Sequence, residues 1–169
     1  MKLKIEPHQR KVHDFLRHVA IYEDQIKDTF HTYILNDSER LKGFCTAEGT
    51  QKYYDRSQSG ETVLDVHPDN FKSPLYKPEL KISSIGYGTY MGDPDDYTDF
   101  CMYDSIKQAA MSGAVNHFDT APNFRYSKSE KTIGKALNTL CRKYNFSRDE
   151  FFLTSKVGFI PEDVDAGIS

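Results

Sequence analysis

The chain of 169 residues is long enough for one ordinary domain. It carries 22 Lys and Arg against 25 Asp and Glu, a net charge of −3, which argues against a general nucleic-acid binder because such proteins usually gather a basic excess on one face. No apolar run approaches the roughly 20 residues that a membrane-spanning helix needs.

Cysteine usage and the N-terminus indicate where the protein resides. Three widely spaced cysteines, Cys45, Cys101 and Cys141, form no C-x-x-C pair, which suits a reducing, intracellular compartment and predicts no metal site. The N-terminus lacks the apolar core of a secretory signal. Glu6 and Asp14 count against a mitochondrial presequence, so we expect a cytoplasmic protein rather than a mitochondrial one.

Residues 1–79 are expected to form an N-terminal extension. A helix is predicted over about Gln9–Leu35, because apolar residues recur there near a 3.6-residue period. The residues of this stripe are Val12, Leu16, Val19, Ile26, Phe30 and Ile34. Such an amphipathic helix is interpreted as docking on a neighbouring surface. From Asn36 to Glu79 the turn signals predict an irregular but ordered arm rather than a second domain.

From Leu80 onward the pattern becomes regular, and residues 80–169 are expected to form an α/β domain. The expected elements, in order, are a strand over 81–90, a helix over 98–112, a strand over 114–120, a helix introduced by a capping box Ser127-x-x-Glu130, and a strand over 150–159. Each helix is expected to carry one apolar face, formed by Phe100, Tyr103, Ile106 and Ala110 in the first and by Ile133, Leu137, Leu140, Cys141 and Tyr144 in the second. The first helix is expected to end at Gly113. Alternation at this spacing predicts crossover units and a parallel sheet.

Polar and glycine residues follow each predicted strand. Parallel strands present functional groups at their C-terminal ends. Gly88-Thr89-Tyr90, Asp119 and Lys156 all fall there. An Asp and a Lys on nearby strand ends predict a buried ion pair, which is compatible either with catalysis or with ordinary polar strand ends. His117 lies on the same strand face as Asp119 and is interpreted as a hydrogen-bonded interior residue.

The stretch from about Leu80 to Gly158 resembles the N-terminal part of the aldo-keto reductases. The matching text is "SSIGYGTYMGDPDD", "NHFDTAPNFRYSKSEKTIGKAL" and "LTSKVGF". The resemblance implies a TIM-type (β/α)8 barrel and NADPH-dependent reduction of carbonyls. It also implies catalytic roles for Asp119 and Lys156, with Gly88, Thr89, Tyr90 and Asp119 on the nicotinamide side of the cofactor.

Two departures from the family pattern shape the functional hypothesis. Phe124 stands where the family has its catalytic tyrosine, and phenylalanine has no proton to donate. Tyr126, two residues on, is the nearest hydroxyl that could replace it. The chain is also expected to hold only the first three β/α units of an incomplete barrel, without the strand that carries the family's histidine.

We therefore expect an oxidoreductase by ancestry that is inactive or incomplete as given. Two alternatives stay open: a non-catalytic structural subunit of a larger assembly, with another protein chain completing or covering the partial barrel, or a fragment of a longer active reductase.

Overall fold

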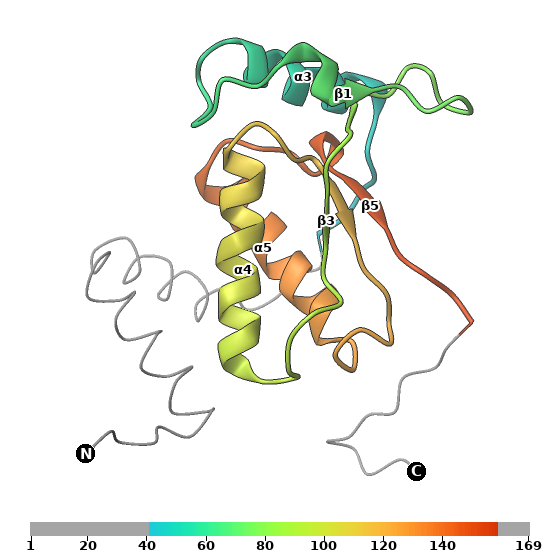
Figure 1. The fold of residues 1–169 in the computed structure, drawn as a ribbon, viewed down its shortest axis with the longest axis vertical. Coiled ribbons are helices and arrows are strands. Elements are labelled where there is room, and N and C mark those ends of the chain that lie inside the picture. Colours follow the sequence, from blue (N-terminus) through green and yellow to red (C-terminus); the bar gives the residue numbers. More distant parts are fainter. Residues whose placement is uncertain (1–40, 159–169) are drawn as a thin grey trace, which may run out of the picture. The chain divides into compact units, whose positions relative to one another are not determined.

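The computed structural model describes residues 41–158. Its elements are α3 (Ala47–Gln58), the 3-10 turn η1 (Pro68–Asn70), β1 (Phe71–Lys72), β2 (Ile82–Ser83), β3 (Gly86–Gly88), α4 (Asp96–Met111), β4 (His117–Asp119), α5 (Lys128–Lys143), the 3-10 turn η2 (Arg148–Glu150) and β5 (Phe152–Thr154) (Figure 1). The predicted helix over 9–35 lies outside the described residues, so it stays a prediction.

Strands β3, β4 and β5 form a parallel sheet in sequential order. Gly88 pairs with Asp119, and Asp119 pairs with Thr154, so the three strands end at the same level. Helices α4 and α5 pack beside each other along the strands (Figure 1). The predicted α/β alternation with a parallel sheet is confirmed, whereas the number of barrel units stays a prediction.

The core lies where α4 and α5 face the sheet. The predicted apolar face of α4 is confirmed, because Tyr103 and Ile106 are fully buried. The stripe of α5 is likewise buried at Ile133 and Leu137. The Tyr103 hydroxyl shares a hydrogen bond of 2.8 Å with Thr139 between the two helices. Each such apolar side chain contributes about 1.5–3 kcal/mol through burial, which makes this interface the main support of the sheet.

The predicted single strand over 81–90 is wrong, because the structure divides it between two sheets. β2 pairs antiparallel with β1, whereas β3 belongs to the parallel sheet. The break occurs at Ser83, whose backbone N–H donates to the side-chain carbonyl of Asn116 at 2.8 Å. The Ser83 hydroxyl accepts from the Asn116 backbone N–H at 3.1 Å and donates to the Ile85 carbonyl at 2.8 Å. A buried side chain thus replaces ladder hydrogen bonds at this point.

The prediction that residues 36–79 form an irregular arm is wrong over α3. This helix has few apolar residues, so its periodicity is weak. Its formation depends instead on Tyr53, which is 1 % exposed and packs on the rings of Phe71, Phe146 and Phe151 at 5.9–6.2 Å between centroids. Thr46 caps the helix by accepting from the Gly49 N–H at 2.9 Å.

A buried carboxylate ties α3 to η2. Glu150 has a fully buried side chain, paired with Lys52 at 3.0 Å and with Arg56 at 3.3 Å. It also accepts from the Ser147 backbone N–H at 2.9 Å. Because η2 directly precedes β5, this cluster lies at the end of the sheet opposite to the strand ends that carry Asp119.

Gly49 is required by the close approach of α3 to η2. A Cβ at this position would overlap the backbone carbonyl of Asp149. We expect Gly49→Ala to destabilise the fold by about 1–3 kcal/mol, the usual cost of overpacking. The control is Gly134→Ala in α5, where a Cβ meets nothing within 4 Å, so better helix propensity makes it neutral or stabilising. Urea unfolding of both variants tests this, and equal midpoints would contradict it.

The capping box predicted at Ser127 is wrong. Ser127 does precede α5, but its φ of 64° is left-handed, whereas a capping residue normally has extended backbone. Its hydroxyl therefore donates back to the Pro122 carbonyl at 3.1 Å. The Glu130 carboxylate instead accepts from the Ser155 hydroxyl at 2.6 Å. The glycine predicted after α4 is confirmed, since Gly113 has a φ of 83°.

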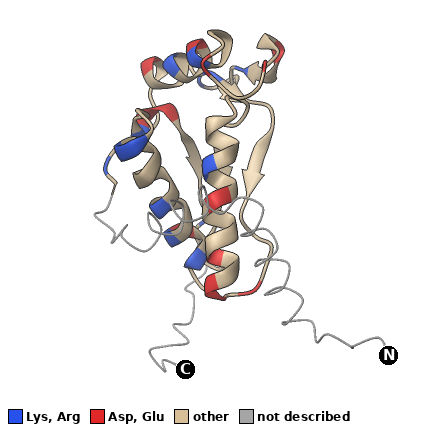
Figure 2. Cartoon of the chain, turned by 90° about the vertical axis from the view of Figure 1, so that its left-hand side faces the viewer, with Lys and Arg blue, Asp and Glu red and all other residues tan. Residues whose placement is uncertain are grey.

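Charged residues of both signs lie along the described helices. Figure 2 shows Lys and Arg interspersed with Asp and Glu along the helices. Within residues 41–158, no helix combines the length and the apolar character needed to cross a bilayer.

Candidate active site

The structure brings Asp119 and Lys156 together at the C-terminal end of the parallel sheet. The Lys156 ammonium lies 2.8 Å from Asp119 Oδ2 and 3.0 Å from Oδ1. Both side chains are close to half exposed, at 49 % for the lysine and 42 % for the aspartate. The predicted ion pair is therefore formed, but the prediction that it is buried is wrong, because the pair lies at the open end of the sheet and not in the core.

Two further groups hold this pair in place. Lys156 also donates to the Thr120 carbonyl at 2.8 Å, and the Thr154 hydroxyl donates to Asp119 Oδ1 at 2.7 Å. Our sequence reasoning missed Thr154. Its position two residues before Lys156 is the signal that could have found it, because residues two apart in an extended segment lie on the same face.

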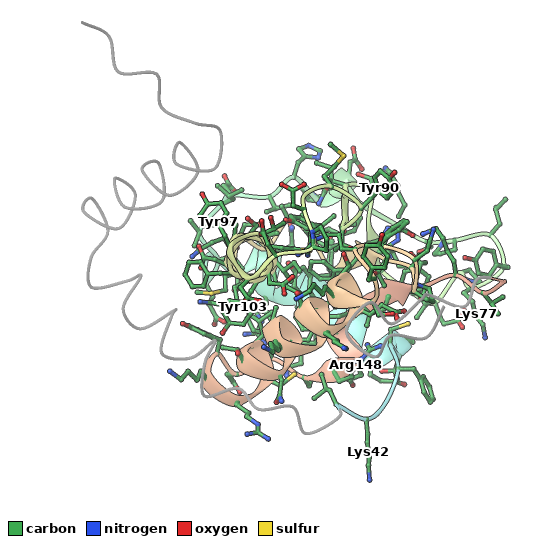
Figure 3. All side chains as sticks on the ribbon, turned by 90° about the horizontal axis from the view of Figure 1, so that it is seen from below. Lys42, Lys77, Tyr90, Tyr97, Tyr103 and Arg148 are labelled. Carbon is green, nitrogen blue, oxygen red and sulfur yellow. The ribbon has the colours of Figure 1, made fainter. Side chains whose placement is uncertain are left out.

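The ring of Phe124 lies against the same ammonium. Its centroid is 4.7 Å from Lys156 Nζ, the arrangement of a cation–π contact. Tyr90 packs edge-on against Phe124 with centroids 5.1 Å apart, and its side chain is 65 % exposed (Figure 3). Lys156 thus has a carboxylate on one side and an aromatic face on another.

The end of β3 supports this arrangement from its backbone. Thr89 is fully buried, and both its N–H and its hydroxyl donate to the Asp119 carbonyl, at 3.1 and 3.0 Å. Its own carbonyl accepts from the Ser129 hydroxyl at 2.7 Å. Gly88 borders open space, since a Cβ there would meet nothing within 4 Å. Thr89 therefore positions Asp119, while Gly88 and Tyr90 face outward.

Tyr126 and His117 differ in their relation to the site. Tyr126 is 52 % exposed and has a left-handed φ of 54°. His117 is half-buried, and its buried Nε2 has no hydrogen-bond partner among the described residues, so the interpretation of a hydrogen-bonded interior residue is wrong for that atom. Burial lowers the pKa of His117, opposed by the Asp119 carboxylate. A ring kept neutral in this way tolerates the missing partner better than a charged one.

The ion pair gives folding stability a defined pH dependence. The hydrogen bond from Lys156 lowers the pKa of Asp119 below its usual value near 3.8, against an opposing effect of burial. Because the pKa of Asp119 is lower in the folded than in the unfolded protein, the stability that the ion pair contributes is fully present above the unfolded pKa. This stability is lost as the pH falls through the folded pKa.

We expect the Lys156→Met variant to melt at a lower temperature than the parent protein at neutral pH. Below about pH 4, the difference between the two melting temperatures should become smaller. Thermal melts from pH 2 to 7 measure this. Curves that stay parallel across that range would show that the pair does not contribute through Asp119 ionisation. Glu61→Gln, at an exposed position, is the control.

The described residues 41–158 contain no group of three or more His, Cys, Asp or Glu arranged to hold a metal ion. The strand ends offer an ammonium, a carboxylate and aromatic rings. This combination, together with the parallel strands that carry it, agrees with a comparison against protein families. Residues 84–169 match the model of the aldo/keto reductase family. The chain belongs to this family.

Searches of curated proteins and of solved structures found no match. The family match covers the three parallel strands and every residue of the site. As an aldo/keto reductase family member, the chain has its Asp and Lys at the expected strand ends. The departure at Phe124 that the resemblance implies stays a prediction. The roles assigned to Asp119, Lys156 and the segment 88–90 stay predictions.

Proposed function

We propose that this chain carries an aldo/keto reductase site that accepts the nicotinamide end of NADP(H) but does not reduce carbonyls by the family's usual proton transfer. The observation that supports this most strongly is the contact between Phe124 and Lys156. The ring occupies the position that the resemblance gives to the proton donor, 4.7 Å from the ammonium, and carries no hydroxyl.

The chemistry depends on what the ammonium faces. A tyrosine with an ordinary pKa near 10 is a poor acid at neutral pH, and a neighbouring ammonium lowers that pKa by stabilising the phenolate. Asp119 keeps Lys156 charged and oriented through two hydrogen bonds. In this chain the oriented charge contacts a π-face, which cannot release a proton to a carbonyl oxygen.

The described residues fit the nicotinamide end of the cofactor. Gly88 leaves open space at the strand end, Tyr90 offers an exposed aromatic side chain, and Asp119 offers a half-exposed carboxylate. We infer that these residues and Thr89 would hold the ring. The chemistry that NADPH supplies when bound is donation of a hydride to a carbonyl carbon.

The test uses the full-length protein. NADPH binding is followed by fluorescence, and aldehyde reduction is followed by loss of NADPH absorbance. We expect saturable binding with turnover far below the usual 1–10³ s⁻¹ of enzymes. Turnover within that range would overturn the proposal. If Tyr126→Phe then abolished this activity, Tyr126 would be the donor.

A second proposal is a non-catalytic role within an assembly. β3 and β5 each pair with only one strand of the described sheet, so their outer edges have no strand partner there. Open edges normally require cover, from this chain or from another protein. Native mass spectrometry of protein from its source would reveal a heavier complex, and a lone chain would exclude this role.

A further inference from the structure

The turn that carries Phe124 has an unusual backbone. Three consecutive non-glycine residues, Arg125, Tyr126 and Ser127, have φ values of 52°, 54° and 64°. L-residues avoid this left-handed region because Cβ approaches the following carbonyl too closely. Such a run persists only where surrounding contacts determine it, and strained backbone of this kind gathers at functional sites.

Local hydrogen bonds shape the turn but do not attach it to the rest of the site. The Phe124 N–H donates to the Ala121 carbonyl at 3.0 Å, and the Ser127 N–H donates to the Pro122 carbonyl at 2.9 Å. Both bonds lie within the segment itself. Ser129, just after the turn, is attached to the end of β3 by its hydrogen bond to the Thr89 carbonyl. A contact from the turn itself to the loop before α4 would fix the turn further.

The side chain of Arg125 makes that contact. It is 2 % exposed and forms an ion pair with Asp99 of α4. Its Nε donates to the Asp93 carbonyl at 2.9 Å, and its Nη2 to the Asp95 carbonyl at 3.4 Å. A third nitrogen lies 3.5 Å from the Met102 sulfur. One guanidinium thus engages both the loop before α4 and the helix itself.

The loop that Arg125 grips follows directly after Tyr90. Residues 91–95 connect β3 to α4, and Tyr90 at their start packs against Phe124. We propose that Arg125 is a positioning residue, which holds the ring of residue 124 over the Lys156 ammonium by tying the β4–α5 turn to the β3–α4 loop. This inference rests on the proposed function, in which residue 124 occupies the proton-donor position.

Arginine is the residue type that suits this role. Its planar guanidinium donates in several fixed directions at once and remains charged when buried. Lysine offers a compact charge at the end of a flexible stem and does not reproduce this fork. Asp99 is also approached by Lys128 at 3.6 Å and accepts from the Thr132 hydroxyl at 3.4 Å, so its own position is well supported.

The experiment uses a phenol at position 124 as the probe. Phe124→Tyr is made in the full protein with tyrosine labelled at ¹³Cζ, and the additional resonance relative to the parent is titrated by NMR. We expect the pKa of this phenol to lie at least one unit below the ordinary value of about 10, because it faces the ammonium. Adding Arg125→Lys is expected to return the pKa toward 10, because the ring is no longer held in place.

Controls separate this inference from the proposed function and from a general loss of stability. Adding Lys156→Met to Phe124→Tyr must also raise the phenol pKa, and if it does not, the site geometry behind the proposed function is wrong. Adding Gly49→Ala, at the far end of the sheet, destabilises the fold and must leave the pKa low. If Lys156→Met raises the pKa while Arg125→Lys leaves it unchanged, the positioning role alone is overturned.

A second variant keeps the inference testable if Arg125→Lys does not fold. Asp99→Asn preserves the shape and one acceptor oxygen but removes the charge that anchors the guanidinium. We expect the phenol pKa in Phe124→Tyr/Asp99→Asn to rise in the same direction by a smaller amount. An unchanged pKa in this variant would likewise contradict the positioning role.

Discussion

Replacing Phe124 with tyrosine is expected to raise the rate of carbonyl reduction by about 10²–10⁴-fold, the usual contribution of a positioned general acid. The ring already lies 4.7 Å from Lys156 Nζ, so the variant adds a hydroxyl without demanding a new backbone position. Steady-state aldehyde reduction with NADPH, in the full-length protein, measures the effect. The increase is expected mainly in kcat, because the new group acts on the transition state.

The matched control is the double variant Phe124→Tyr/Lys156→Met. It keeps the new hydroxyl and removes the ammonium that lowers the phenol pKa, so most of the gain should disappear. If the Phe124→Tyr variant binds NADPH but reduces carbonyls no faster than the parent protein, the missing hydroxyl is not what limits the rate. A gain that survives Lys156→Met would show that the ammonium plays no part in activating the phenol.

The second large effect is expected on stability, at the end of the sheet remote from the site. Glu150→Ala should destabilise the fold by about 3–5 kcal/mol, because it removes one partner of a buried ionic cluster and leaves Arg56 unpaired. Glu150 has no exposed surface. Its carboxylate forms ion pairs with Lys52 and Arg56 and accepts a hydrogen bond from the Ser147 backbone N–H. Urea unfolding gives the free energy directly.

Two controls sharpen that measurement. Glu61→Ala removes an exposed carboxylate and should change stability by no more than about 0.5 kcal/mol. The double variant Glu150→Leu/Arg56→Met replaces both charges with apolar groups and should be less destabilised than Glu150→Ala, since neither charge is left buried alone. If Glu150→Ala costs no more than Glu61→Ala, α3 does not depend on this cluster.

The candidate site could be predicted largely because its residues follow directly after strands. In a parallel sheet, the ends of neighbouring strands meet at one level, so Asp119 and Lys156 were expected to approach each other from their sequence positions alone. That Phe124 stands at the family's tyrosine position followed from a resemblance, not from periodicity, and its contact with Lys156 was not predicted. Thr154 and Arg125 were missed, because their roles depend on which neighbours their side chains reach.

The α/β alternation and the buried faces of α4 and α5 could be predicted because they are local patterns. Hydrophobic periodicity acts over one or two turns and is therefore visible in the sequence. Helix α3 could not be predicted in this way, because the residues that hold it in place lie about 100 positions away in the sequence. Tyr53 of α3 packs on Phe151, and Arg56 of α3 pairs with the buried carboxylate of Glu150. The few apolar residues of that helix form no long stripe, and a capping residue such as Thr46 does not by itself predict a helix.

The sequence by itself determined that residue 124 lacks a hydroxyl, since covalent order settles it, and local patterns placed Asp119 and Lys156 near the ends of neighbouring strands. Only the tertiary structure decided that the Asn116 side chain breaks the strand over 81–90, that Ser127 adopts a left-handed backbone, and that Arg125 reaches the neighbouring loop. The physical reason is that buried polar groups take whichever partner the folded chain brings within hydrogen-bonding distance, and sequence spacing does not reveal that partner.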